Sequence, residues 1–126
     1  MASTDLRRYS ALARSTETFG RVLCSARTQH FVVDGPVQNG CPGEALSPAE
    51  LFLAGVATCG VELVQVIARD QEVPLQAVNA TIEALQDRSK PPRPEVSLFN
   101  RVRLEFHLEG VTPEQGTQLI DSFKRR

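Results

Sequence analysis

One apolar stretch, Ser47–Arg69 (SPAELFLAGVATCGVELVQVIAR), constrains the fold more than any other part of the chain. It opens with helix-start signals, because Ser47 can act as the N-cap, Pro48 suits the first helical position and Glu50 completes a capping box. Between positions 51 and 61 only one residue is clearly polar, and apolar residues fall on every side of the predicted helix. A helix that is apolar all round is typical of a buried position. The rest of the chain is therefore expected to wrap around it.

Composition narrows the class of protein. We expect a single domain over residues 1–126, with 41% hydrophobic residues, 23% charged residues and a net charge of −1. Such a balance offers no basic excess for nucleic acid and no charge block for a membrane surface. The apolar run is predicted to be too short to span a bilayer, and Glu50, Glu62 and Arg69 bracket it. The first fifteen residues lack the apolar core of a secretory signal.

The cysteines and histidines indicate neither a disulfide scaffold nor a metal centre. Cys24, Cys41 and Cys59 are odd in number and lack metal-ligand spacing. This usage favours a reducing, cytoplasmic setting. His30 and His107 have no carboxylate cluster to join them, so we expect no metal and no cofactor.

Periodicity and turn signals predict an α+β chain. The expected elements, in order, are strands at 9–16, 21–27 and 29–34, a loop at 35–46, the long helix, strands at about 75–87 and 99–108, and a final helix that opens at 112–115. The segment 88–97 holds three prolines and is expected to be an exposed loop. In so small a chain, these strands are too few to cover a helix on every side. We therefore expect an intimate homodimer in which a second copy supplies part of the cover.

Cys59, in the middle of the apolar helix, has two possible roles. Free cysteine is among the most buried residue types, so simple packing is one interpretation. A reactive role requires the thiolate, and apolar surroundings disfavour that form. A nearby cation from another segment would then be needed, and the candidates on the early strands are Arg14, Arg21 and Arg27.

A carboxylate could hold such an arginine in place through a bidentate pair. Glu50 is the candidate on the same helix, but nine residues separate it from Cys59, which places the two about 180° apart around the helix. Glu50 could therefore act on Cys59 only indirectly. A plain capping role for Glu50 is an equally valid interpretation.

Two segments carry a resemblance to a known family. The run His30–Pro36 (HFVVDGP), a glycine-containing loop, and then Ser47–Cys59 (SPAELFLAGVATC) resemble the OsmC/Ohr family, the osmotically inducible and organic hydroperoxide resistance proteins. The chain is closer to the OsmC-like branch. The resemblance covers about residues 20–123, and the segment around Cys59 is its most specific part.

The resemblance implies both a fold and an activity. The implied fold is α+β, with antiparallel sheets wrapped around a long central helix in an intertwined homodimer, and with active sites at the dimer interface. The implied activity is thiol-dependent reduction of organic hydroperoxides in oxidative-stress defence. By this resemblance Cys59 is the nucleophile, Arg27 (or Arg21 as the alternative) stabilises its thiolate, and Glu50 lies near the orienting position.

The chain departs from the family pattern in two places. The orienting glutamate of well-characterised members directly follows the proline, where this chain has Ala49 and carries Glu50 one residue later. The second, resolving cysteine is expected in a Cys-Pro pair near or beyond the point where this chain stops, so we expect the chain to be short at its C-terminus. The only Cys-Pro pair is Cys41-Pro42, in the loop. Cys24 and Cys41 are the remaining candidates for a resolving thiol.

These departures leave two hypotheses for function. The first is a hydroperoxide reductase (an oxidoreductase of the peroxidase type) that uses a small hydroperoxide and an external thiol or dithiol. The second is a catalytically weak or inactive dimer that binds a small apolar ligand at its interface.

Overall fold

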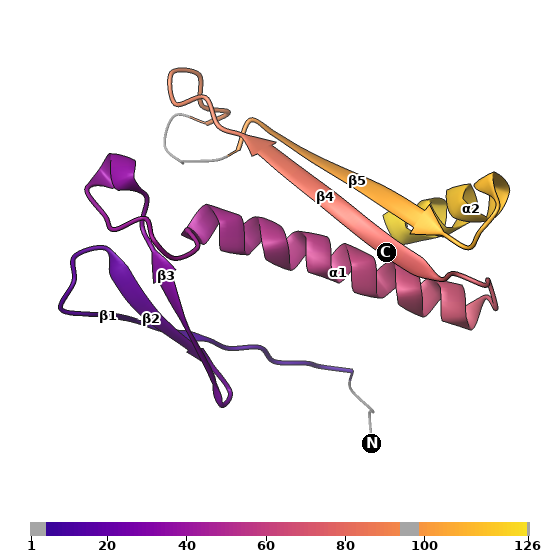
Figure 1. Ribbon diagram of the computed structural model, residues 1–126, viewed down its shortest axis with the longest axis horizontal. Coiled ribbons are helices and arrows are strands. Elements are labelled where there is room, and N and C mark those ends of the chain that lie inside the picture. Colours follow the sequence, from indigo (N-terminus) through magenta and orange to yellow (C-terminus); the bar gives the residue numbers. More distant parts are fainter. Residues whose placement is uncertain (1–4, 94–98, 126) are drawn as a thin grey trace. The chain divides into compact units, whose positions relative to one another are not determined.

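The computed structural model describes residues 5–93 and 99–125, and it confirms the α+β class (Figure 1). The elements are β1 (Leu12–Ser15), β2 (Arg21–Ala26), β3 (Gln29–Asp34), the 3-10 helix η1 (Val37–Asn39), α1 (Pro48–Asp70), β4 (Ala77–Leu85), β5 (Arg101–Glu109) and α2 (Pro113–Lys124). Residues 94–97 of the proline-rich loop predicted at 88–97 lie outside the described residues. The chain forms two compact units, Met1–Leu51 and Phe52–Arg126.

The first unit is built on an antiparallel three-stranded sheet in the order β1-β2-β3. The two residues Arg27 and Thr28 connect β2 to β3, so that Arg21 lies opposite Asp34 at the far end of the hairpin. The loop that follows β3 returns to the sheet, because the Asp34 N–H donates to the Leu46 carbonyl over 2.9 Å. The residues just before α1 are thereby attached to the end of β3.

Cys41, in the loop between β3 and α1, packs closely against two glycines. A Cβ added at Gly20 or at Gly35 would collide with the Cys41 sulfur. The backbones of these glycines are also joined, since the Gly35 N–H donates to the Gly20 carbonyl over 2.8 Å. Cys41 thus fills a notch that only glycines leave open, which accounts for the half-buried position of its thiol.

The second unit packs helices against a two-stranded antiparallel sheet, β4-β5. The predicted alternation is confirmed, because the partly buried positions of both strands recur at every second residue over most of their length. The fully or nearly buried core residues are Val64, Ile67 and Ala68 of α1, Val78 of β4 and Leu119 of α2. Figure 1 shows α1 and the β4-β5 ribbon running beside each other, with α2 near the carboxyl-terminal part of α1.

The described residues of the single chain do not bury α1 on every side, and the predicted cover from a second copy stays a prediction. The buried residues of α1 are Gly60, Val64, Ile67 and Ala68, all in its second half. In its first half Phe52 is 60% exposed and Val56 is 39% exposed. The reason is that the described part of the second unit packs two strands and one helix on a single face of α1, and its apolar side chains extend beyond that face.

Length does not exclude α1 as a membrane span, contrary to the sequence-based expectation. Its 23 residues include an 18-residue window with a mean hydropathy of 1.9, which is long and apolar enough by composition to cross a bilayer. The core helix of a soluble protein meets the same criterion, so this observation assigns no membrane role.

Candidate active site

The Cys59 side chain is exposed on α1 and belongs to an apolar stripe. Phe52, Val56 and Cys59 are separated by four and three residues, so they lie on one side of the helix. None of the three cysteines forms a disulfide. Cys59 therefore presents a free thiol among apolar neighbours, on a part of α1 that the described residues leave exposed.

The neighbouring residue, Gly60, faces the interior. A Cβ at Gly60 would lie 2.9 Å from the ring tip of Phe106 and 3.6 Å from that of Phe123. These two rings meet edge to face, with centroids 5.1 Å apart. Successive side chains on a helix point about 100° apart. Because Gly60 packs closely against Phe106, the direction in which Cys59 projects is fixed.

Glu50 forms the capping box that the sequence predicts. Its carboxylate accepts from the Ser47 N–H over 2.9 Å, and its own N–H donates to the Ser47 hydroxyl over 3.2 Å. The Ser47 N–H lowers the pKa of the Glu50 carboxyl, with a further contribution from the Ser47 hydroxyl. Glu50 thus stabilises the start of α1, and the described residues include no arginine paired with it.

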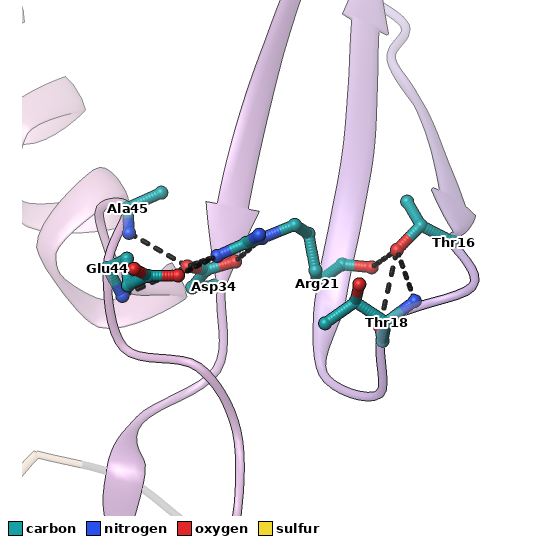
Figure 2. Close-up of polar contacts among 6 residues, drawn as sticks. All are labelled: Thr16, Thr18, Arg21, Asp34, Glu44 and Ala45. Carbon is teal, nitrogen blue, oxygen red and sulfur yellow. Dashed lines mark hydrogen bonds and ion pairs between the residues drawn. The ribbon is translucent and has the colours of Figure 1, made fainter.

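Arg21 is held by two carboxylates (Figure 2). Its Nε and Nη2 donate to the two oxygens of Asp34 over 2.8 and 2.9 Å, and Nη2 also donates to Glu44 over 2.7 Å. The N–H groups of Glu44 and Ala45 donate to the same Asp34 oxygen over 3.0 and 2.8 Å. Thr16 steadies the backbone, since its hydroxyl donates to the Arg21 carbonyl over 2.9 Å. We call Arg21, Asp34 and Glu44 the charged cluster.

The charged cluster is strongly coupled electrostatically. The Asp34 side chain is fully buried, whereas that of Arg21 is 30% exposed. The hydrogen bond from Arg21, followed by that from the Ala45 N–H, holds the pKa of Asp34 well below its usual range. Hydrogen bonds to Asp34, and to a lesser extent to Glu44, raise the pKa of Arg21 above its usual value. With one cation and two anions, the cluster has no positive charge to spare for a thiolate.

Arg27 is placed differently from Arg21. It lies in the two-residue turn between β2 and β3, it is exposed, and its φ of +54° is in the left-handed region. The described residues offer no salt-bridge partner for Arg27 or for Arg14. Within the part of the chain that the structure describes, both guanidinium groups therefore lack an acidic partner, in contrast to that of Arg21.

The predicted site residues divide between the two units. Arg21, Arg27 and Glu50 belong to the first unit and Cys59 belongs to the second. The structure brings Arg21 together with Asp34 and Glu44 instead of with Glu50. Cys59 has no polar partner among the described residues.

Sequence reasoning singled out neither Asp34 nor Glu44 as a site residue. Asp34 is nevertheless a buried carboxylate that accepts four hydrogen bonds. The sequence contains a signal for the pairing of Asp34 with Arg21, because Arg21 lies six residues before Arg27 and Asp34 lies six residues after Thr28. A two-residue turn therefore sets the opposite charges of Arg21 and Asp34 face to face.

One family model matches the chain, and several solved structures share its fold. The model of the family described as "OsmC-like protein" matches residues 41–126. An OsmC-like protein from Mycoplasma pneumoniae superposes with a TM-score of 0.81 at 14% identity, over 98% of this chain and 84% of that one. An organic hydroperoxide resistance protein OsmC from Legionella pneumophila gives 0.70 at 25% identity, over 95% and 84%. One from Elizabethkingia anophelis, with thiocyanate bound, gives 0.70 at 19% identity, over 98% and 85%. A search of curated proteins finds no match.

Proposed function

The chain belongs to the OsmC-like protein family, and we propose on that basis that it reduces organic hydroperoxides with Cys59 as the nucleophile. The observation that carries the proposal is the free, exposed thiol of Cys59 on α1, within the stretch that the family model matches. Two of the similar structures are organic hydroperoxide resistance proteins, which supports the choice of substrate. The apolar stripe around Cys59 suits the organic part of such a substrate.

The first chemical step is a two-electron reduction of the peroxide. The Cys59 thiolate attacks one oxygen of the O–O bond, so that an S–O bond forms and the O–O bond breaks. The departing alkoxide takes up a proton and leaves as the alcohol, and Cys59 becomes a sulfenic acid. An external thiol then condenses with the sulfenic acid and releases water, and a second external thiol returns Cys59 to its reduced form with formation of an external disulfide.

An external thiol is proposed because the other two cysteines serve packing positions. Cys24 is half-buried in β2, and Cys41 fills the notch formed by Gly20 and Gly35. Releasing either sulfur for a disulfide would disrupt the first unit. A one-cysteine cycle avoids that cost.

Arg27 remains the proposed partner of the Cys59 thiolate. Its guanidinium has no acidic partner among the described residues, whereas Arg21 is neutralised by Asp34 and Glu44. An uncommitted guanidinium can stabilise a thiolate through charge-assisted hydrogen bonds. Arg21 stays the alternative partner of the Cys59 thiolate. In the structure, Arg21 holds the loop before α1 through Asp34 and Glu44.

We propose that the active form is a homodimer. The exposed apolar stripe of α1, which includes Phe52 and Val56, would be covered by the second copy. Size-exclusion chromatography with light scattering is expected to give twice the mass of the chain. A monomer at micromolar concentration would rule out this assembly.

Trapping the sulfenic acid tests the enzyme proposal. After one equivalent of cumene hydroperoxide, dimedone is expected to label Cys59, with intact-protein mass spectrometry and peptide mapping as the readout. Cys59→Ser is expected to reduce peroxide consumption, with dithiothreitol as the reductant, to the rate of buffer alone. Cys24→Ser serves as the matched control and is expected to keep turnover.

Two results would refute the proposal. Persistence of the peroxide with Cys59 unlabelled would remove the catalytic role and favour the ligand-binding alternative. Loss of turnover in Cys24→Ser, with a folded circular dichroism spectrum, would contradict the one-cysteine cycle.

A further inference from the structure

We propose that a groove between β5 and α2 is a second ligand site, which binds uncharged aliphatic molecules with a hydroxyl head. The groove has a volume of about 520 Å³ and lies entirely within the second unit. That volume is within the range of small-molecule sites, roughly 300–1,000 Å³. The proposal does not rest on the peroxidase function, because an alcohol brings no oxidant and Cys59 does not line the groove.

The floor of the groove is apolar. It is formed by Phe106 and Leu108 of β5, Val111 of the connecting turn and Ile120 of α2. All four are partly buried hydrophobic residues that pack against the core of the second unit. An aliphatic chain laid on this floor would cover apolar surface that the described protein leaves open to water.

Gly116 opens the groove. It lies within α2, where glycine is a poor helix former. A Cβ at this position would stand 3.4 Å from Leu108 Cδ1 and 3.8 Å from Val111 Cγ2, which is ordinary van der Waals contact. Packing therefore does not require glycine here. Its effect is to leave room between α2 and β5 that any larger side chain would fill.

The rim of the groove selects the head group. The hydroxyls of Thr112 and Thr117 are engaged, since Thr112 accepts from the Gln115 N–H and Thr117 donates to the Pro113 carbonyl. Asp121 and Lys124 have no ion-pair partner among the described residues, and they lie three residues apart on α2, where side chains are neighbours.

Opposite charges at the rim disfavour a charged ligand. A carboxylate that approached Lys124 would meet the Asp121 carboxylate, and an ammonium group that approached Asp121 would meet Lys124. A hydroxyl can donate to Asp121 and accept from Lys124 at once. Saturated alcohols of medium chain length therefore match both the floor and the rim.

Methyl NMR with three matched probes tests the proposal on the full-length chain. 1-Octanol is expected to shift the methyl signals of Leu108, Val111 and Ile120 in a saturable way, and octanoate and octylammonium are expected to bind more weakly. Gly116→Leu, which fills the groove, is expected to weaken 1-octanol binding by about tenfold or more. Gln118→Leu adds the same side chain to α2 outside the groove lining and is expected to leave binding unchanged.

The outcomes separate the parts of the proposal. Absence of saturable shifts with 1-octanol overturns the site, and tighter binding of octanoate or octylammonium overturns the head-group assignment. Equal binding by wild type and a folded Gly116→Leu variant places the alcohol elsewhere and also overturns the site. If Gly116→Leu fails to fold, Gly116→Ala takes its place, because alanine favours the helix and still narrows the groove. None of these results depends on peroxide turnover.

Discussion

In residues 1–51 the groups that fix the chain are charged, whereas in residues 52–126 they are apolar. The first unit attaches its loop to the sheet through Arg21, Asp34 and Glu44, with Asp34 fully buried. The second unit joins α1, β4 and α2 through a core in which Val64, Ile67 and Leu119 have no exposed surface. The two units therefore differ in the kind of change to which they are sensitive.

The difference follows from what each unit can bury. A small sheet followed by a long loop has few apolar residues to enclose, so hydrogen bonds to one buried carboxylate fix the loop. Helices packed on a ribbon can enclose aliphatic side chains directly. A change in side-chain volume should thus damage the second unit most, and a change in charge or pH should damage the first.

The largest expected effect comes from Leu119→Ala. This change removes a fully buried side chain from the core and leaves a cavity, so the free energy of unfolding should fall by about 2–5 kcal/mol. Urea titration followed by circular dichroism measures the loss. Leu85→Ala, at a side chain that is 58% exposed, is the matched control and should change stability by about 0.5 kcal/mol or less. Equal losses in the two variants would contradict the apolar account of the second unit.

The next largest effect on stability is expected for Gly60→Ala. The new Cβ would lie 2.9 Å from Phe106, and the overpacking should cost about 1–3 kcal/mol, partly offset by the better helix propensity of alanine. Gly55→Ala is the matched control, because a Cβ there meets nothing within 4 Å and should raise stability. The test is the difference in unfolding free energy between the two variants. A Gly60→Ala protein as stable as Gly55→Ala would show that the Phe106 ring moves aside at little energetic cost.

The local parts of this structure could be predicted from the sequence. The start of α1 at Pro48, with the capping box of Ser47 and Glu50, follows from short-range hydrogen bonds that the residue types dictate. The alternation of β5 follows from one buried face. Both depend on residues within a few positions of one another.

The remaining features depend on distant partners. Apolar composition indicates that α1 needs cover but does not tell which side of the helix the chain itself covers, so the exposure of Phe52 could not be predicted. Glu44 reaches Arg21 only because the loop from 35 to 46 folds back onto β3, and no local pattern encodes that return. The pairing of Arg21 with Asp34 was predictable from hairpin register, but the Arg27-Thr28 turn has no glycine to mark it.

A smaller, pH-dependent effect is expected for Asp34→Asn. Asparagine can still accept hydrogen bonds from the N–H groups of Glu44 and Ala45, and Arg21 keeps its ion pair with Glu44. The fold should therefore persist at a lower Tm. Because the pKa of Asp34 is lowered in the folded state, its stabilising contribution is complete above the unfolded value of about 3.9 and is lost as the pH falls below it.

Thermal unfolding from pH 8 to pH 2.5 checks that sign. The gap in Tm between wild type and Asp34→Asn should be constant down to about pH 5 and should narrow below about pH 4. Asp5→Asn, at a side chain that is 94% exposed, should show only a small gap at every pH. A gap for Asp34→Asn that widens in acid would reverse the assigned role of the carboxylate.

The smallest effect on stability is expected for Arg27→Gly, although this residue is charged and belongs to the unit that depends on charge. Its φ of +54° suits glycine, and the relief of strain is opposed by the greater freedom of glycine in the unfolded chain, so the net change should be within about 1 kcal/mol. Thr28→Gly, in the same turn, is the control. If Arg27 stabilises the Cys59 thiolate, the rate of Cys59 sulfenylation should fall in Arg27→Gly while the Tm stays near that of wild type. An unchanged sulfenylation rate would transfer the role to another arginine, and a large fall in Tm would show that charge at this turn supports the fold.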